Sequence, residues 1–239
     1  MVDKGGKTST GKRFGEPCIR HVEGYIGFRV CTNNHDCASC AFEQDFTDHY
    51  RVNAVVRLVQ GLDVAGFQVA RGYYFHRGHT WVRVEEDRTV RVGLDDFALK
   101  VLGPFDSIQV PLVGKPVKQG RRDITVRRGE NSSAVQSPVS GVITAFNRDL
   151  LEGSRPASEN PYTDGWLMTV HCPSLRENLS KLMIDRETEA FIAGKVGALF
   201  DTIEETVGPM ANDGGIIRGN LLGEAPELGW GRLSRLVFG

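Results

Sequence analysis

Four cysteines near the start of the chain have the spacing of a metal-binding motif. Cys37 and Cys40 are separated by two residues, and Cys18 and Cys31 precede them. Four thiolates suit a tetrahedral zinc ion, and the two-residue pair is a common zinc knuckle. A zinc ion would also stabilise a segment that has too few apolar residues for a core. We therefore predict a structural metal site formed by Cys18, Cys31, Cys37 and Cys40.

Other chemistry remains open for these thiols. The same four ligands can hold an iron–sulfur cluster. Cys37 and Cys40 could instead be a redox-active dithiol, because a helix is expected to begin near Cys40 and would favour a thiolate there. His35 or His21 could replace one thiolate, although solvent-facing histidines are the simpler interpretation, and plain reduced or disulfide-paired cysteines remain a further one. The fifth cysteine, Cys172, is expected in the core or at its edge.

The remaining polar candidates have simpler structural explanations. His76 and His79 could hold a metal, but strand packing explains His79 and Trp81 better, and Asp95 with Asp96 is expected at a helix start. The sequence has no Ser-His-Asp order, phosphate-binding glycine loop or HExxH motif, so we predict that the protein is not an enzyme. A cluster of four arginines could dock an acidic partner, although a solvated face is the commoner meaning. These are Arg121, Arg122, Arg127 and Arg128.

Short strands separated by turns dominate residues 73–170, and this pattern indicates a barrel or sandwich. Helices are expected on either side of this block, at about residues 41–62 and 175–199. Residues 22–30 favour a strand or hairpin, because they are rich in aromatic and branched side chains. A closing helix is expected to place three apolar side chains on one side, namely Trp230, Leu233 and Leu236.

Composition and charge exclude several classes of function. The chain has 239 residues, of which 40% are hydrophobic and 25% charged, with a formal net charge of -1. The near-zero charge gives no sign of a nucleic-acid or anionic-membrane partner. No apolar run is long enough to span a membrane, and the basic start of the chain lacks the apolar core of a secretory signal. We expect a cytoplasmic protein without direct membrane insertion.

Five segments of the central block carry a family resemblance. They are residues 79–84, 92–98, 112–120, 137–143 and 160–167, and the Pro-Val-Ser-Gly turn in the fourth is the strongest match. In this order they resemble motifs of the glycine cleavage H protein, a member of the lipoyl-domain superfamily. The resemblance covers roughly residues 73–193. It implies an α+β, mainly β, lipoyl-type barrel-sandwich hybrid with helices at its periphery.

The resemblance also identifies a position that has lost its chemistry. In that family a lysine on an exposed hairpin carries lipoic acid through an amide bond. Counting back from Pro138, the corresponding residue is Glu130, and a carboxylate cannot form that amide. No lysine lies between Lys118 and Lys181, so a shifted alignment does not restore one. The family's glutamate three residues before the lysine is replaced by Arg127. We therefore predict no lipoate.

The segments suggest four parts of the chain. Residues 1–15 are expected to be a disordered tail, and residues 16–66 a Cys-rich metal-binding segment followed by a helix. Residues 70–195 form the H-protein-like domain, and residues 196–239 a helical extension. We expect residues 73–193 to fold without the Cys-rich segment.

The predicted function is that of a non-catalytic, non-lipoylated adaptor or complex subunit. Its partners are expected to be proteins, in a redox or regulatory complex, with zinc as a structural metal. One alternative is an electron-transfer subunit with an iron–sulfur cluster or redox dithiol in the cysteine cluster. The other is a glycine cleavage carrier protein, which the loss of the lysine counts against.

Overall fold

The structure is a computed structural model that describes residues 16–22, 26–46, 61–150, 155–208 and 219–239. The chain divides into two compact units, Met1–Leu58 and Val59–Gly239. Within the described part of the first unit lie a short helix, a 3-10 helix and a helical segment at residues 41–46. The predicted tail, residues 1–15, lies outside the described residues. The short helix is α1 (Ile19–Val22), and the 3-10 helix is η1 (Cys37–Ser39).

Two expectations for the first unit need correction. The strand or hairpin predicted for residues 22–30 is not seen in the described part of that range, residues 22 and 26–30. Helix α1 ends at Val22, and of these residues only Val30 makes an antiparallel bridge, to Pro17. The backbone N–H groups of His21 and Val22 bond the carbonyl of Cys18, at 2.9 and 3.1 Å, and these local bonds form a helical turn instead. The helix predicted for residues 41–62 is seen at 41–46, and residues 47–60 lie outside the described part. By residue 61 the chain is already in a strand.

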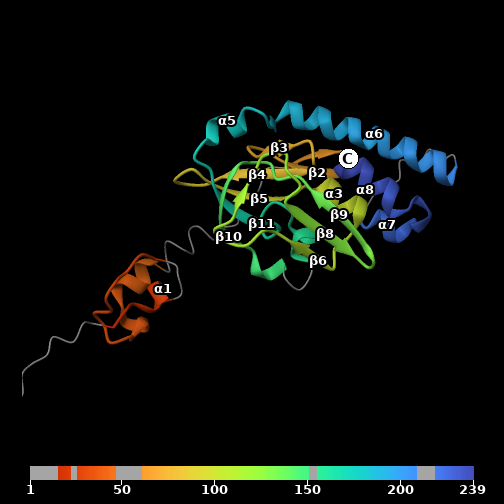
Figure 1. The fold of residues 1–239 in the computed structure, drawn as a ribbon. Coiled ribbons are helices and arrows are strands. Elements are labelled where there is room, and N and C mark those ends of the chain that lie inside the picture. The colour runs from red at the N-terminus through yellow and green to blue at the C-terminus, as the bar shows by residue number, and fades with distance from the viewer. Residues whose placement is uncertain (1–15, 23–25, 47–60, 151–154, 209–218) are drawn as a thin grey trace, which may run out of the picture. The chain divides into compact units, whose positions relative to one another are not determined.

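The second unit is built mainly from antiparallel strands (Figure 1). A seven-stranded sheet has the order β12-β3-β4-β5-β11-β10-β7, a three-stranded sheet the order β6-β8-β9, and β1 pairs with β2. With helices around these sheets, the predicted α+β, mainly β fold class is confirmed. The strands are β1 (Gly61–Val64), β2 (Phe67–Ala70), β3 (Tyr74–His76), β4 (Thr80–Val84), β5 (Thr89–Leu94), β6 (Ser107–Gln109), β7 (Pro116–Val117), β8 (Ile124–Arg128), β9 (Asn131–Val135), β10 (Gly141–Phe146), β11 (Trp166–His171) and β12 (Met183–Ile184).

Trp81 lies at the centre of this unit and explains a glycine in the neighbouring strand. Its side chain is fully buried, and the indole N–H donates to the carbonyls of Leu94 and Pro161, at 2.9 and 3.0 Å. Gly93 is its partner in the β4–β5 register, and a Cβ atom there would overlap the indole ring. Close packing of the tryptophan therefore requires a glycine at position 93.

The helix predicted for residues 175–199 is interrupted in the structure. Helix α5 ends at Leu179, and Met183 and Ile184 then pair with Phe75 and Tyr74 of β3 before α6 begins. Pairing with an edge strand outweighs local helical preference here, because it satisfies backbone groups across the sheet. Figure 1 shows α6 running along one side of the unit, and it extends past residue 199. The helices of this region are α5 (Leu175–Leu179) and α6 (Arg186–Val207).

The C-terminal segment packs back onto the sheet region rather than projecting from it. Helices α7 and α8 contact α3, and α8 also contacts β9 and α6. The closing helix is confirmed: Leu233 is fully buried, while Trp230 and Leu236 pack against the core. Within the described ranges, no helix is both long and apolar enough to cross a membrane. The remaining helices are α3 (Asp96–Leu102), η2 (Arg148–Leu150), α4 (Arg155–Glu159), α7 (Leu221–Glu224), η3 (Pro226–Leu228) and α8 (Trp230–Phe238).

Candidate functional site

The β8–β9 hairpin places Glu130 at an exposed tip. The strands pair in register up to Arg128 and Asn131, so Gly129 and Glu130 form the two-residue turn. Gly129 has a φ of 56°, and glycine suits the first position of a tight hairpin turn because it adopts positive φ without strain. Its N–H donates to the Asp106 carboxylate at 2.6 Å, which ties the turn to the start of β6. A side chain at position 130 therefore projects from a fixed support into solvent.

Most of the hairpin's arginines are engaged within the chain. Arg121 forms an ion pair with Asp123 at 2.6 Å, and Arg128 donates to the carbonyl of Leu102 at the end of α3. Arg122 donates to the carbonyl of Phe238 at 3.4 Å. The fourth arginine, Arg127, is exposed, and its side chain makes no hydrogen bond or ion pair with a described residue. These contacts favour a structural role for the basic hairpin over a docking surface for an acidic partner.

The four N-terminal cysteines line one small cavity. Cys18, Cys31, Cys37 and Cys40 come from three stretches of sequence, and the cavity that they share has a volume of about 20 Å³. Partial burial raises the pKa of the Cys37 thiol, and the charges of Glu43 and of the other three cysteines raise it further. The fold therefore brings the predicted ligands within electrostatic reach of one another. Still, in the described part of the chain no three His, Cys, Asp or Glu side chains already have the arrangement of a metal site.

The fifth cysteine and the paired histidines are structural. Cys172 is fully buried, and burial raises the pKa of its thiol to about 11. The Nδ1 atom of His79 lies 2.8 Å from Asp95 in the core, whereas that of His76 accepts from the Gly78 N–H at 3.0 Å. Asp95 is also the N-cap of α3 and accepts from the Ala98 N–H at 2.9 Å, as expected for a helix start.

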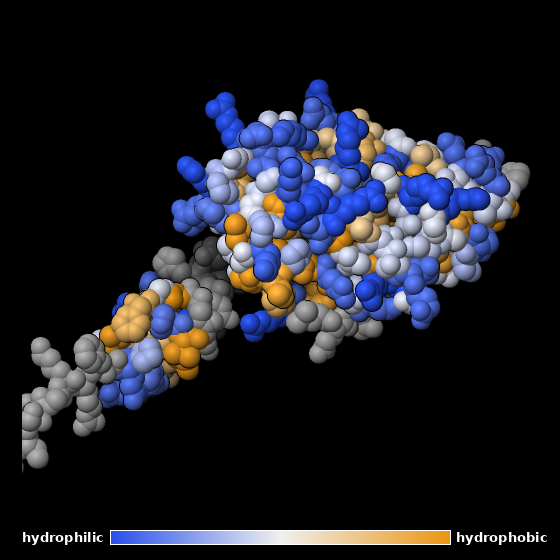
Figure 2. Space-filling model, viewed as in Figure 1, coloured by the Kyte–Doolittle hydropathy of each residue, from blue (hydrophilic) through white to orange (hydrophobic). Residues whose placement is uncertain are grey.

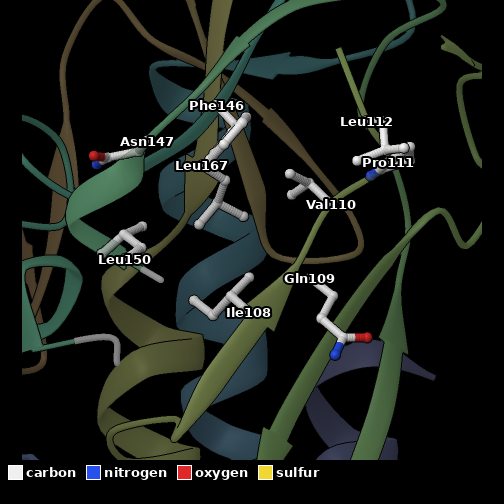
Figure 3. A pocket seen from close by; sticks show the side chains of 9 residues that line it. All are labelled: Ile108, Gln109, Val110, Pro111, Leu112, Phe146, Asn147, Leu150 and Leu167. Carbon is white, nitrogen blue, oxygen red and sulfur yellow. The ribbon is translucent and has the colours of Figure 1, made fainter. Parts of the chain in front are cut away.

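An apolar pocket beside β6 was not predicted from the sequence. It has a volume of about 190 Å³ and lies between β6, the loop after it, and the ends of β10 and β11. In Figure 3, Ile108, Leu150 and Leu167 point toward one another, while Gln109 points away. A run of four apolar residues at positions 110–113, just before a turn, is the sequence signal that could have revealed it.

Exposed apolar side chains continue from the pocket across the neighbouring surface. Leu112 is 72% exposed, Val113 51% and Val142 40%. The turn that follows Leu112 is bonded to β10, because the Gly114 N–H donates to the carbonyl of Ile143 at 2.8 Å. Figure 2 shows apolar side chains gathered on the surface near β10. We call the pocket and these three side chains the β10 patch.

Comparisons with known proteins agree on the central block. A model of the family described as glycine cleavage H-protein matches residues 73–195. A probable glycine cleavage system H protein from Pyrococcus furiosus is 34% identical over 122 residues, which is 51% of this chain and 90% of the relative. A glycine cleavage system H protein from Mycobacterium leprae is 36% identical over 112 residues, covering 46% of this chain and 85% of the relative. The crystal structure of an H protein from Mycobacterium marinum covers 53% of this chain and 99% of its own, with 24% identity and a TM-score of 0.46.

Proposed function

Because the chain belongs to the glycine cleavage H-protein family, we propose that it is a docking subunit that keeps the family's fold but carries no lipoyl arm. Proteins of this family are carriers rather than catalysts, and the chain is not an enzyme. Carriers act by contact with other proteins, which supports protein partners for this chain. In this proposal it is a subunit of a larger redox or regulatory complex.

The observation that carries the proposal is the residue at the hairpin tip. Glu130 is exposed on a turn held by Asp106, where a modified side chain could reach a partner, yet it has no amine to be acylated. The sequence has no lysine between Lys118 and Lys181, so the whole hairpin lacks one. An exposed tip contributes little to packing, and the fold can persist without the lysine.

Two surfaces support a role in protein contact. The β10 patch exposes apolar side chains beside a pocket, and exposed apolar surface of this kind is typical of protein interaction sites. The N-terminal cysteine unit adds a second surface.

Family membership itself favours the second candidate, a carrier in glycine cleavage. The relatives are named for that system, and the chain matches 90% of the length of the Pyrococcus furiosus protein. A carrier role would require the transported group to be attached somewhere other than the hairpin tip. Lys115, Lys118 and Lys181 are exposed, but all three lie outside the β8–β9 hairpin. We therefore rank the carrier role second.

Lipoylation of purified variants by a lipoate–protein ligase tests the proposal. We expect the unaltered chain to stay unmodified, because no acceptor amine stands at the tip. Glu130→Lys should be modified poorly and Glu130→Lys with Arg127→Glu better, since a basic side chain beside the tip would repel a ligase that expects an acidic one. Mass spectrometry of the intact chain gives the modified fraction.

Ser132→Lys, with or without Arg127→Glu, is the matched control. It places an amine on the same exposed hairpin, two residues beyond the tip. We expect no modification, which would show that position 130 and not mere exposure defines the site. Ligase-dependent modification of the unaltered chain at any residue would contradict the proposal and support the carrier role.

A further inference from the structure

The N-terminal unit has no buried residue among those that the structure describes at positions 16–22 and 26–46. Phe28 is 73% exposed and Val22 is 68% exposed, whereas the second unit has a continuous apolar core. Below about 40 residues, a folded segment usually needs a metal, disulfides or a partner to offset its conformational entropy. Hydrophobic burial therefore does not explain why the described residues of this unit fold.

Backbone hydrogen bonds bring the first two cysteines together. The Cys18 N–H donates to the carbonyl of Arg29 at 2.7 Å, and the Cys31 N–H donates to the carbonyl of Glu16 at 2.7 Å. These two bonds flank the bridge between the two segments, so Cys18 and Cys31 lie on either side of the same bridge although 13 positions separate them in sequence.

A tight turn supplies the other two thiols. The Cys40 N–H donates to the carbonyl of Cys37 at 3.2 Å across η1, and Cys40 leads directly into the helical segment at 41–46. The result is a cavity lined by all four sulfur-bearing side chains. Its volume of about 20 Å³ is enough for one ion, because a space of about 10–15 Å³ already holds a water molecule.

The surrounding contacts favour thiols over histidines as ligands. The N–H of His35 points at the sulfur of Cys31 at 3.2 Å, and such a bond stabilises a thiolate. The ring of His35 is already engaged by the carbonyl of Pro17 at 2.9 Å and by the carboxylate of Glu16 at 3.2 Å. The ring of His21 lies 3.3 Å from the carbonyl of Ile26, and it stacks edge-on against Phe28.

We propose that Cys18, Cys31, Cys37 and Cys40 bind one zinc ion that stabilises the fold of the N-terminal unit. Binding draws the four sulfurs to the zinc–sulfur distance of about 2.3 Å and releases their protons. No electron transfer is involved, so the site is structural. This inference concerns a different unit from the hairpin and does not depend on whether the chain is lipoylated.

Metal analysis of the full chain tests the site. Elemental analysis should find one zinc per chain, and replacing zinc by cobalt(II) should give the intense sulfur-to-cobalt absorption of a tetrahedral thiolate site. Cys18→Ser and Cys37→Ser should each reduce the zinc content severalfold. Cys172→Ser should leave it unchanged, because that thiol is buried in the second unit.

Several results would overturn the proposal. One is an unaltered chain that is free of metal and whose mass shows disulfides among the four cysteines. Another is iron with acid-labile sulfide in place of zinc. The third is that the serine variants retain full zinc. The cobalt spectrum is recorded on the unaltered chain. It therefore tests the site even if the serine variants fail to fold. The lipoylation assay measures modification of the second unit, whereas the metal analysis concerns the first. The zinc proposal and the proposed function can therefore fail independently.

Discussion

Asp95 serves two buried groups with one carboxylate. It accepts the Ala98 N–H at the start of α3, and its other oxygen lies 2.8 Å from Nδ1 of His79. The imidazole is stacked on Phe97 with ring centroids 4.8 Å apart, and it is fully buried. Its Nε2 atom has no hydrogen-bond partner in the part of the chain that the structure describes. The pair therefore links β4 to α3 inside the core.

Substitution of Asp95 separates these two roles. Asp95→Ala should lower the free energy of unfolding by about 2–4 kcal/mol, because it removes a helix cap and leaves a buried imidazole nitrogen unpaired. Asp95→Ser keeps a capping oxygen but is too short to reach His79, so it should cost about 1 kcal/mol less. Urea unfolding measures both values. Equal losses for the two variants would show that the cap contributes nothing.

The buried thiol of Cys172 predicts a pH dependence. Its pKa rises from 9.0 to about 11 on folding because burial disfavours the thiolate. Below pH 9 both states hold the proton, so this contribution to stability is fully present. Between pH 9 and 11 the unfolded state loses the proton first, and stability should fall by at most about 1.4 kcal/mol per pH unit.

The matched variant is Cys172→Ala, which cannot lose that proton. Other titrating groups are shared, so the difference in unfolding free energy between the two chains isolates the thiol. We expect this difference to be constant below pH 9 and to change between pH 9 and 11. A difference that is constant throughout would contradict the burial effect.

The sequence predicted the local structural roles of single residues but not the distant residues that they contact. The helix start at Asp95 was predictable because capping depends on neighbours within three positions. The contact of Asp95 with His79 crosses 16 positions, and the pairing of β4 with β5 creates it. The four cysteines were predictable as a group from their spacing, whereas the bonds that assemble them and the small cavity required the fold.

Helix α6 carries two glycines that nothing in the structure requires. Gly194 and Gly197 lie on its exposed face, and an added Cβ would meet no atom within 4 Å. Each Gly→Ala change should therefore stabilise the unit by about 1 kcal/mol, since alanine costs less backbone entropy in a helix. Thermal or urea unfolding gives the value.

Gly93→Ala is the opposing case. Its Cβ would overlap the buried indole of Trp81, and a rigid ring in a packed core cannot move away cheaply. We expect a loss of about 1–3 kcal/mol or more. If Gly93→Ala is as stable as the α6 variants, the tight packing of β5 on Trp81 is not present in solution.

The ends of helices and strands were predictable from sequence where the apolar pattern along the chain sets them. They were not predictable where pairing with a distant strand sets them. The closing helix at Trp230–Phe238 follows its apolar periodicity, and the structure has it there. The break between α5 and α6 is made by a two-residue strand on the edge of the large sheet, which helical periodicity cannot indicate. The apolar pocket likewise forms only when β6, β10 and β11 converge.

The core of the second unit extends beyond the family match at both ends. Phe67 of β2 and Leu233 of α8 are almost fully buried, as are other residues of β2, α6 and α8. Each large apolar side chain contributes about 1.5–3 kcal/mol on burial, and a domain has only about 5–15 kcal/mol in total. We therefore now expect residues 73–193 to lack part of the core that stabilises the unit.

Two truncated chains test this revision. Residues 59–239 should unfold cooperatively with the same midpoint as the second unit of the full chain, whereas residues 73–193 should show no cooperative transition. Urea titration followed by tryptophan fluorescence and circular dichroism measures both. A cooperative transition of residues 73–193 at an unchanged midpoint would show that β2, α7 and α8 add little stability.

The molecule as a whole combines a carrier fold, a hairpin without an attachment point, and a cysteine unit. Family membership explains the first, and the glutamate at position 130 is the basis of our proposal that the chain carries no lipoyl group. The intact mass of the protein purified from its native cells tests this claim most directly. We predict a mass without a lipoyl group. An added mass of one lipoyl group, mapped to any lysine of the chain, would contradict the account and restore the carrier role.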